Sequence, residues 1–189
     1  MESNTRRFDS SAIEVVDYDP TWSEMYRNES RKIKELLGDK ILSMEHIGST
    51  SIPGLASKPI IDMVVVVPSW KEINDLIKSL SLLGYPQEVG ITEESEAGER
   101  YLLRKGNPVQ FHLSIAYSAR GSFLERQILF RDYLREHVEE KNQYDQLKKE
   151  LLTEKTLSED EYVNGKTDFV MRILKKAGFQ NKWFDLSKY

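Results

Sequence analysis

The sequence predicts an α+β protein in which a mixed or antiparallel sheet is flanked by helices and followed by a helical C-terminal part. Residues 59–67 form a nearly continuous, valine-rich apolar run, which is typical of a central buried strand. Apolar and polar side chains alternate over residues 109–116, as in a strand with one polar face. After Gly121 the apolar residues follow helical spacing. Mixed elements followed by helices indicate the fold class.

The composition is that of an ordinary globular chain. It has 189 residues, of which 39% are hydrophobic and 31% charged, so we expect one domain, or one domain with a helical extension. The lack of cysteine excludes disulfides and thiolate metal sites and makes a cytoplasmic location the expectation. A formal charge of −4 argues against general nucleic-acid binding. The polar start and the short apolar runs predict neither a signal peptide nor membrane contact.

Helix starts are indicated by capping boxes, in which serine or threonine precedes glutamate by three positions. Three of them predict helices that begin near residues 21, 69 and 158: Thr21 with Glu24, Ser69 with Glu72, and Ser158 with Glu161. The first helix is expected to end at Gly38 and the second near Leu80. The other expected elements are an extended segment from Ile13, strands over 41–47 and 101–104, a loop over 48–54, a loop or irregular hairpin over 84–98, a turn over 106–108, and helices over 123–137, 139–152 and 159–176.

We expect three parts along the chain. Residues 1–11 form a polar lead, residues 12–120 an α/β core, and residues 121–189 a helical part packed on that core. No flexible linker marks the boundary near residue 120.

The most informative stretch is a Gly-Ser loop between two predicted strands. Glycine at Gly48 lets the backbone approach a phosphate closely, and the amides and hydroxyls of Ser49, Thr50 and Ser51 can bind phosphate oxygens. Asp62 follows in an otherwise apolar strand, where an unpaired carboxylate is costly. It could hold a Mg²⁺ that bridges those phosphates. The alternative is structural: Asp62 pairs with Lys58 or caps the loop backbone.

The sequence resembles the GrpB-like family of bacterial proteins, which is also found fused to dephospho-coenzyme A kinase. The resemblance covers nearly the whole chain and is carried by the start of the chain (Ile13 to Val16, then Asp19, Pro20 and Trp22), by residues 46–55, 58–62 and 129–135, and by Tyr144, Leu147, Lys148, Tyr162 and Lys166. It implies a fold of the DNA polymerase beta-like nucleotidyltransferase type.

The sequence departs from active nucleotidyltransferases in its carboxylates. Those enzymes usually carry Asp-x-Asp and a third carboxylate on a later strand, whereas here Val64 stands two positions after Asp62, and the later strand offers His112 and Ser114. We therefore expect a single weakly held Mg²⁺, or none, in place of a two-metal site. His112 could be a base, a phosphate donor, a metal ligand or a surface histidine.

The helical part adds cations that could face the loop. Arg131 and Arg135 lie four positions apart, as do Tyr162 and Lys166, so with Lys148 they could line a cleft that faces the loop. Through the resemblance, Arg131 and Lys166 are expected to bind phosphate or an acidic substrate, and Lys58 and Lys148 are further candidate phosphate ligands. The alternative is that these charges are simply exposed to solvent, as most charges on helix surfaces are. The sequence thus favours transfer of a nucleotidyl group from a nucleoside triphosphate to an unknown small acceptor, with Asp62 and His112 catalytic. The alternative is a non-catalytic protein that binds a nucleotide or phosphometabolite and kept the Gly-Ser loop but lost the full metal site. A third hypothesis is an accessory protein of coenzyme A metabolism.

Overall fold

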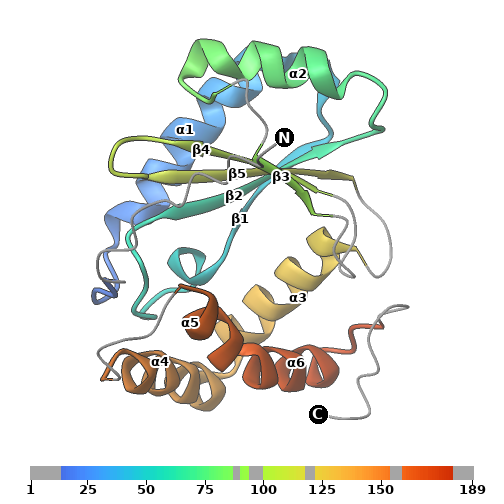
Figure 1. The fold of residues 1–189 in the computed structure, drawn as a ribbon. Helices are drawn as coiled ribbons and strands as arrows, with labels where there is room; N and C mark the ends of the chain where they lie inside the picture. Colours follow the sequence, from blue (N-terminus) through green and yellow to red (C-terminus); the bar gives the residue numbers. More distant parts are fainter. Residues whose placement is uncertain (1–13, 87–89, 94–99, 118–121, 154–158, 181–189) are drawn as a thin grey trace, which may run out of the picture.

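The computed structural model describes residues 14–86, 90–93, 100–117, 122–153 and 159–180. Within them one five-stranded mixed sheet runs in the order β1-β2-β5-β4-β3 (Figure 1). Its strands are β1 (Ser43–Ile47), β2 (Ile61–Val67), β3 (Gly90–Glu93), β4 (Arg100–Lys105) and β5 (Phe111–Tyr117). The helices are α1 (Thr21–Leu37), α2 (Ile73–Leu80), α3 (Phe123–Glu136), α4 (Val138–Thr153), α5 (Glu159–Gly165) and α6 (Thr167–Lys176). The predicted α+β class is confirmed.

The two strands predicted from the valine run and the alternation form the centre of the sheet. β2 and β5 are parallel neighbours, with Ile61 opposite Phe111 and Val67 opposite Tyr117. The other pairs, β1 with β2, β5 with β4 and β4 with β3, are antiparallel. The parallel register places the starts of β2 and β5 side by side, so polar residues near both starts meet.

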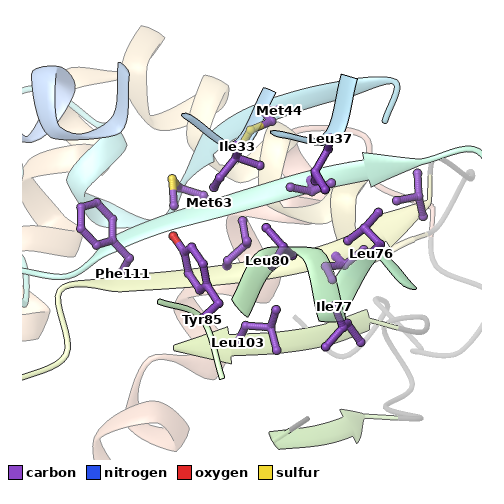
Figure 2. Close-up of a cluster of buried hydrophobic side chains, with 14 of the residues drawn as sticks. Ile33, Leu37, Met44, Met63, Leu76, Ile77, Leu80, Tyr85, Leu103 and Phe111 are labelled. Carbon is purple, nitrogen blue, oxygen red and sulfur yellow. The ribbon is translucent and has the colours of Figure 1, made fainter. Parts of the chain in front are cut away.

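The face of the sheet toward α1 and α2 holds the larger apolar core. Side chains of alternate positions in β2 and β5 pack there against both helices (Figure 2). In this core Ile33 of α1, Leu80 of α2, Met63 of β2 and Ile115 of β5 have no exposed surface. The amphipathic spacing in α1 and α2 is therefore explained by burial of one stripe on the sheet.

The opposite face is covered by the C-terminal helices, which Figure 1 shows on the far side of the sheet from α2. Its apolar cluster is smaller and joins Val64, Val66 and Ala116 to Phe123 and Leu124 of α3. A further cluster joins the loop after β1 to α3, α4 and α6. The division near residue 120 stays a prediction, and both it and the polar lead fall on segments that include residues outside the described ranges.

The capping boxes predicted at Thr21 and Ser69 do not form. α1 begins at Thr21, as predicted, but it has no side-chain cap, and Asp19 Oδ1 accepts the Thr21 N–H at 2.8 Å. Ser69 Oγ accepts from Lys71 N–H, and α2 begins only at Ile73. A capping box that the sequence analysis missed opens α3, where Ser122 Oγ accepts from the Glu125 N–H. Ser158 lies outside the described residues.

Two further expectations need correction. The helix expected over 159–176 is two helices, α5 and α6, because Gly165 and the following Lys166 interrupt it. The polar face of β5 is largely covered, because Ser114 accepts a hydrogen bond from Arg100 and is buried. The segment expected to be a loop or irregular hairpin does contain a strand, β3, which pairs with β4 through an irregular register. No helix in the described ranges is long and apolar enough to cross a membrane.

Candidate functional site

The Gly-Ser loop leaves β1 by a tight turn that runs directly beside Asp62. Gly48 has φ +68°, and a Cβ there would lie 3.0 Å from Asp62 Cβ and Cγ and closer still to Oδ2. Residues 49–51 then form one turn of 3₁₀ helix. Gly48 is therefore required for a close approach to a carboxylate of the protein itself. The sequence analysis had expected it to allow the approach of a phosphate.

Asp62 and His112 form a pair at the starts of the two central strands. They are register partners in the parallel β2–β5 ladder, and Asp62 Oδ1 lies 3.0 Å from His112 Nδ1. Their side chains are 36% and 25% exposed, so both reach solvent. In the tautomer that carries its proton on Nδ1, His112 donates a hydrogen bond from Nδ1 to Asp62, and its Nε2 is left as an acceptor. The structural partner that the sequence analysis considered for Asp62 was Lys58, whereas the partner here is His112.

A polar cavity of about 180 Å³ opens at this pair. It is lined by residues of the loop, of both central strands, of α4 and of the α5–α6 corner: Ser49, Ser57, Lys58, Ile60, Asp62, His112, Lys148, Tyr162 and Lys166. Ser49, Asp62, His112 and Lys166, all candidate site residues from the sequence, line this one cavity, whereas Arg131 does not. Asp62 is the one carboxylate among the described lining residues.

Two of the lining lysines flank an aromatic ring. The Nζ of Lys166 lies 4.1 Å, and that of Lys58 5.4 Å, from the centre of the Tyr162 ring. Lys166 holds this place because it stands at the break between α5 and α6. Tyr162 is 2% exposed, and burial raises the pKa of its hydroxyl to about 12. The cavity is therefore lined by the neutral side chain of Tyr162, with two ammonium groups near its ring.

Lys148 is the third lysine, and it is 2% exposed. Its ammonium donates to the carbonyl oxygen of Ala56, and it lies 4.9 Å from the Tyr144 ring centre. Burial lowers the pKa of Lys148 to about 7, and the charge of Asp145 opposes that shift only in part. Ser49, another lining residue, forms a side-chain hydrogen bond with Tyr144.

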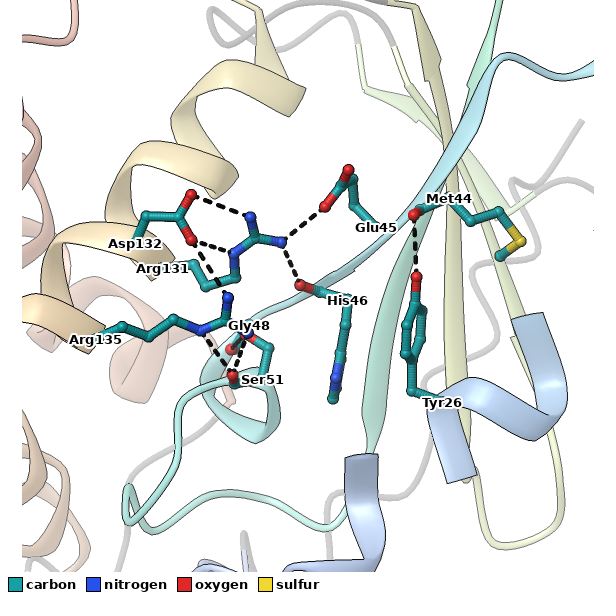
Figure 3. Close-up of polar contacts among 9 residues, drawn as sticks. All are labelled: Tyr26, Met44, Glu45, His46, Gly48, Ser51, Arg131, Asp132 and Arg135. Carbon is teal, nitrogen blue, oxygen red and sulfur yellow. Dashed lines mark hydrogen bonds and ion pairs between the residues drawn. The ribbon is translucent and has the colours of Figure 1, made fainter. Parts of the chain in front are cut away.

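Three predicted phosphate ligands have other roles here. The hydroxyl of Thr50 lies 3.1 Å from His46 Nε2, and Ser51 Oγ donates to the Gly48 carbonyl at 2.6 Å. Arg131 donates to Glu45, to Asp132 and to the His46 carbonyl (Figure 3), and it is not among the lining residues. These groups hold the loop and α3 in place, and their expected contact with phosphate has no support in this geometry.

Side chains from the helices fix the loop, and the sequence analysis named only some of them: Arg135 was expected to face the loop, whereas Asp145 was not named. Arg135 donates to the Ser51 carbonyl at 2.7 and 3.1 Å (Figure 3), and Asp145 accepts from the Ala56 N–H at 2.8 Å. The ring of His46 stacks on Tyr26 with 4.7 Å between centroids. Burial lowers the pKa of His46 to about 4, and the nearby charge of Asp62 opposes this. The four-residue spacing of Arg131 and Arg135 on one helix face was the signal in the sequence that placed Arg135 near the loop.

The donor set fits at most a metal ion that shares its ligands with a substrate. Among the described residues no three His, Cys, Asp or Glu side chains come together to hold a metal. One Asp62 oxygen is already bound to His112. Mg²⁺ is commonly held by one or two carboxylates plus substrate phosphates, so Asp62 could serve only when phosphates supply further ligands.

The fold and the site define an α+β protein with a small, lysine-rich cavity at the starts of two parallel strands. The family model described as GrpB protein matches residues 12–176, and the chain belongs to the GrpB family. It is 35% identical, over 84% of its length, to UPF0157 protein YqkA of Bacillus subtilis, of which it spans 45%. The crystal structure of conserved protein GrpB from Enterococcus faecalis matches with a TM-score of 0.76 and 35% identity, covering 93% of this chain and 99% of that one.

Part of the chain is also similar to a protein with a different name. A dephospho-CoA kinase of Mycolicibacterium paratuberculosis is 30% identical over 61% of this chain, which corresponds to 30% of that protein.

Proposed function

We propose that the cavity binds the phosphate groups of a nucleotide or another phosphorylated small molecule. The observation that carries this proposal is the charge of its lining. Among the described lining residues there are three lysines, Lys58, Lys148 and Lys166, and one carboxylate, Asp62, which is paired with His112. Ammonium groups and the Ser49 hydroxyl are phosphate ligands. With a volume of about 180 Å³, below the several hundred typical for a whole small molecule, the cavity would take the phosphates and leave the rest of the ligand outside.

A thermal-shift panel tests this proposal. Nucleoside mono-, di- and triphosphates, coenzyme A, dephospho-coenzyme A and sugar phosphates are compared with and without Mg²⁺. A ligand present at a hundred times its dissociation constant should stabilise the protein by about 2.7 kcal/mol. Adenosine and sodium chloride of equal ionic strength serve as uncharged and ionic controls. If no phosphate compound stabilises the protein beyond these controls, the proposal is wrong.

A second candidate, nucleotidyl transfer, is favoured by the position of the Asp62–His112 pair inside this cavity. In that reaction an acceptor hydroxyl would attack the α-phosphorus of a nucleoside triphosphate and give its proton to His112 Nε2, while Asp62 holds the ring through Nδ1. The bond between the α-phosphorus and its bridging oxygen would break, and pyrophosphate would leave toward the lysines. A Mg²⁺ shared by Asp62 and the phosphates would neutralise charge.

Two substitutions separate these candidates. If Asp62 shares a Mg²⁺ with the phosphates, Asp62→Asn removes the Mg²⁺-dependent part of nucleotide binding and leaves binding in chelator nearly intact. Ser49→Ala weakens binding in both conditions. Calorimetric titrations with a nucleoside triphosphate, with Mg²⁺ and with chelator, measure this. Equal Mg²⁺-dependent affinity in wild type and Asp62→Asn would eliminate the metal role.

The thermal-shift panel includes coenzyme A compounds because the chain is similar to a dephospho-CoA kinase. An accessory role in coenzyme A metabolism would predict that these compounds bind.

A further inference from the structure

We infer that Lys148 makes the cavity select phosphate chains with two or more phosphoryl groups over a single phosphate. The inference rests on the proposed function and deepens it by naming the ligand class. It starts from an unusual feature, a lysine that is 2% exposed yet lines the cavity beside two other lysines. Buried lysines are rare unless they are paired.

The carboxylate near Lys148 is committed elsewhere. Asp145 Oδ1 accepts from the Ala56 N–H at 2.8 Å, and Asp145 Oδ2 pairs with Lys149 at 2.8 Å. Lys148 itself donates to a neutral partner, the Ala56 carbonyl, which takes one of its three N–H donors. A neutral acceptor compensates a buried ammonium poorly, whereas an anionic ligand in the cavity would compensate it well.

The three lysines are not equivalent. Lys58 and Lys166 sit at the Tyr162 ring and are more exposed than Lys148. Lys148 is the most buried of the three, so its ammonium adds affinity mainly when the ligand is long enough to bring a second phosphoryl group to it. The small volume of the cavity favours recognition of such a chain over recognition of a base or sugar.

Charge and protonation should therefore be linked at Lys148. The charges that act on it are those of Asp145 and Lys149 of α4 and of Lys166 at the α5–α6 corner. The cavity also holds the titratable groups Lys58, Asp62, His112 and Tyr162, and the Tyr144 ring lies beside the ammonium. At pH 8 its pKa of about 7 leaves the free protein with a mostly neutral amine. An arriving polyanion favours the charged form, so binding should take up a proton.

Calorimetry with inorganic pyrophosphate and inorganic phosphate tests this at pH 8, in buffers of different ionisation enthalpy. The wild-type protein should bind pyrophosphate about tenfold or more tightly than phosphate, as expected for one added charge-assisted hydrogen bond. Pyrophosphate binding should take up protons, because Lys148 becomes charged. Without Lys148 the sign should be opposite, since a cationic site favours the deprotonated form of the bound pyrophosphate and so releases protons. Lys148→Met should lose most of the preference, through weaker pyrophosphate binding, and should lose the proton uptake.

Lys141→Met is the matched control. Lys141 lies on the same helix and also donates to a loop carbonyl, that of Pro53 at 3.1 Å, but it does not line the cavity. This variant should keep both the preference and the proton uptake. Lys148→Arg provides a readout if Lys148→Met does not fold. Because arginine stays charged, it should keep the preference and lose the proton uptake.

Each contrary result has a distinct meaning. An unchanged preference in Lys148→Met, or equal loss of affinity for both anions, overturns the inference and leaves the proposed phosphate site standing. Proton uptake that persists in Lys148→Arg places the proton elsewhere and also contradicts the inference. If the wild-type protein binds neither pyrophosphate nor any compound of the thermal-shift panel, the proposed function and this inference fail together.

Discussion

The two sides of the sheet each bury an ionisable side chain, and they treat it differently. On the α1 side the carboxylate of Glu29 is 2% exposed and is bound by Lys105 at 2.5 Å and by the Tyr85 hydroxyl at 3.2 Å. On the α4 side the ammonium of Lys148 is equally buried and donates to a backbone carbonyl. Glu29 has its counter-charge within the chain, as a structural ion does. Among the described residues Lys148 has no such counter-charge of its own, and it lines the cavity proposed to bind phosphate. If the proposal is correct, the difference separates a structural side of the sheet from a ligand-binding side.

The largest expected effect is a loss of stability on the α1 side. Leu80→Ala removes a fully buried side chain of α2 and should lower the free energy of unfolding by about 2–5 kcal/mol. Urea denaturation measures it. The protein that remains folded should bind phosphate ligands with unchanged affinity, and a parallel loss of affinity would break the separation of the two sides.

A smaller loss of stability is expected where the loop crosses Asp62. Gly48→Ala combines a backbone strain of roughly 1–3 kcal/mol with a clash against Asp62 that pushes the carboxylate away from His112. Gly38→Ala is the control, because Gly38 also has positive φ but has no atom within 4 Å of a built Cβ. Urea denaturation of both variants, with the His112 ring resonances followed by NMR, separates strain from clash. Equal effects of the two substitutions on stability and on His112 would contradict the close approach described here.

The pH dependence of stability tests His46, which joins the two sides through Tyr26 and Thr50. Its folded pKa of about 4 lies below the ordinary 6.5. Between these values the unfolded chain holds a proton that the folded protein lacks, so stability falls as the pH drops from 6.5 to 4. The loss is at most about 3 kcal/mol. The difference in unfolding free energy between wild type and His46→Gln, followed over this range, should change by that amount. A constant difference would show that His46 charges freely in the folded state.

How far the sequence predicts this molecule depends on the range of the interactions. The α+β class, the central strands and the GrpB family follow from local patterns, namely the valine run, the alternation after Val109 and the motif around Gly48. The meeting of Asp62 with His112 was also foreseeable, since each is a polar residue in an apolar strand.

The sequence does not reveal which partners the tertiary structure gives to each candidate site residue. Arg131 and Lys166 are indistinguishable in the sequence as helix cations, yet Arg131 faces Glu45 and the His46 carbonyl while Lys166 faces the cavity. Thr50 and Ser51 resemble phosphate ligands in sequence, but their hydroxyls are taken by neighbours within the loop region. Lys148 was expected at the site, but its burial depends on contacts between α4 and residue 56 that no local pattern encodes.

The central claim, that the α4 side binds a phosphate ligand through the lysine-rich cavity, is tested most directly at Lys166. Lys166→Met keeps most of the length of the side chain and removes its charge at a partly exposed position, so the loss of stability should stay near that of one cation–π contact, about 0.5–2 kcal/mol. Calorimetric titration with a nucleoside triphosphate should show about tenfold weaker binding than wild type. Equal affinity of the two proteins for the triphosphate would contradict the claim.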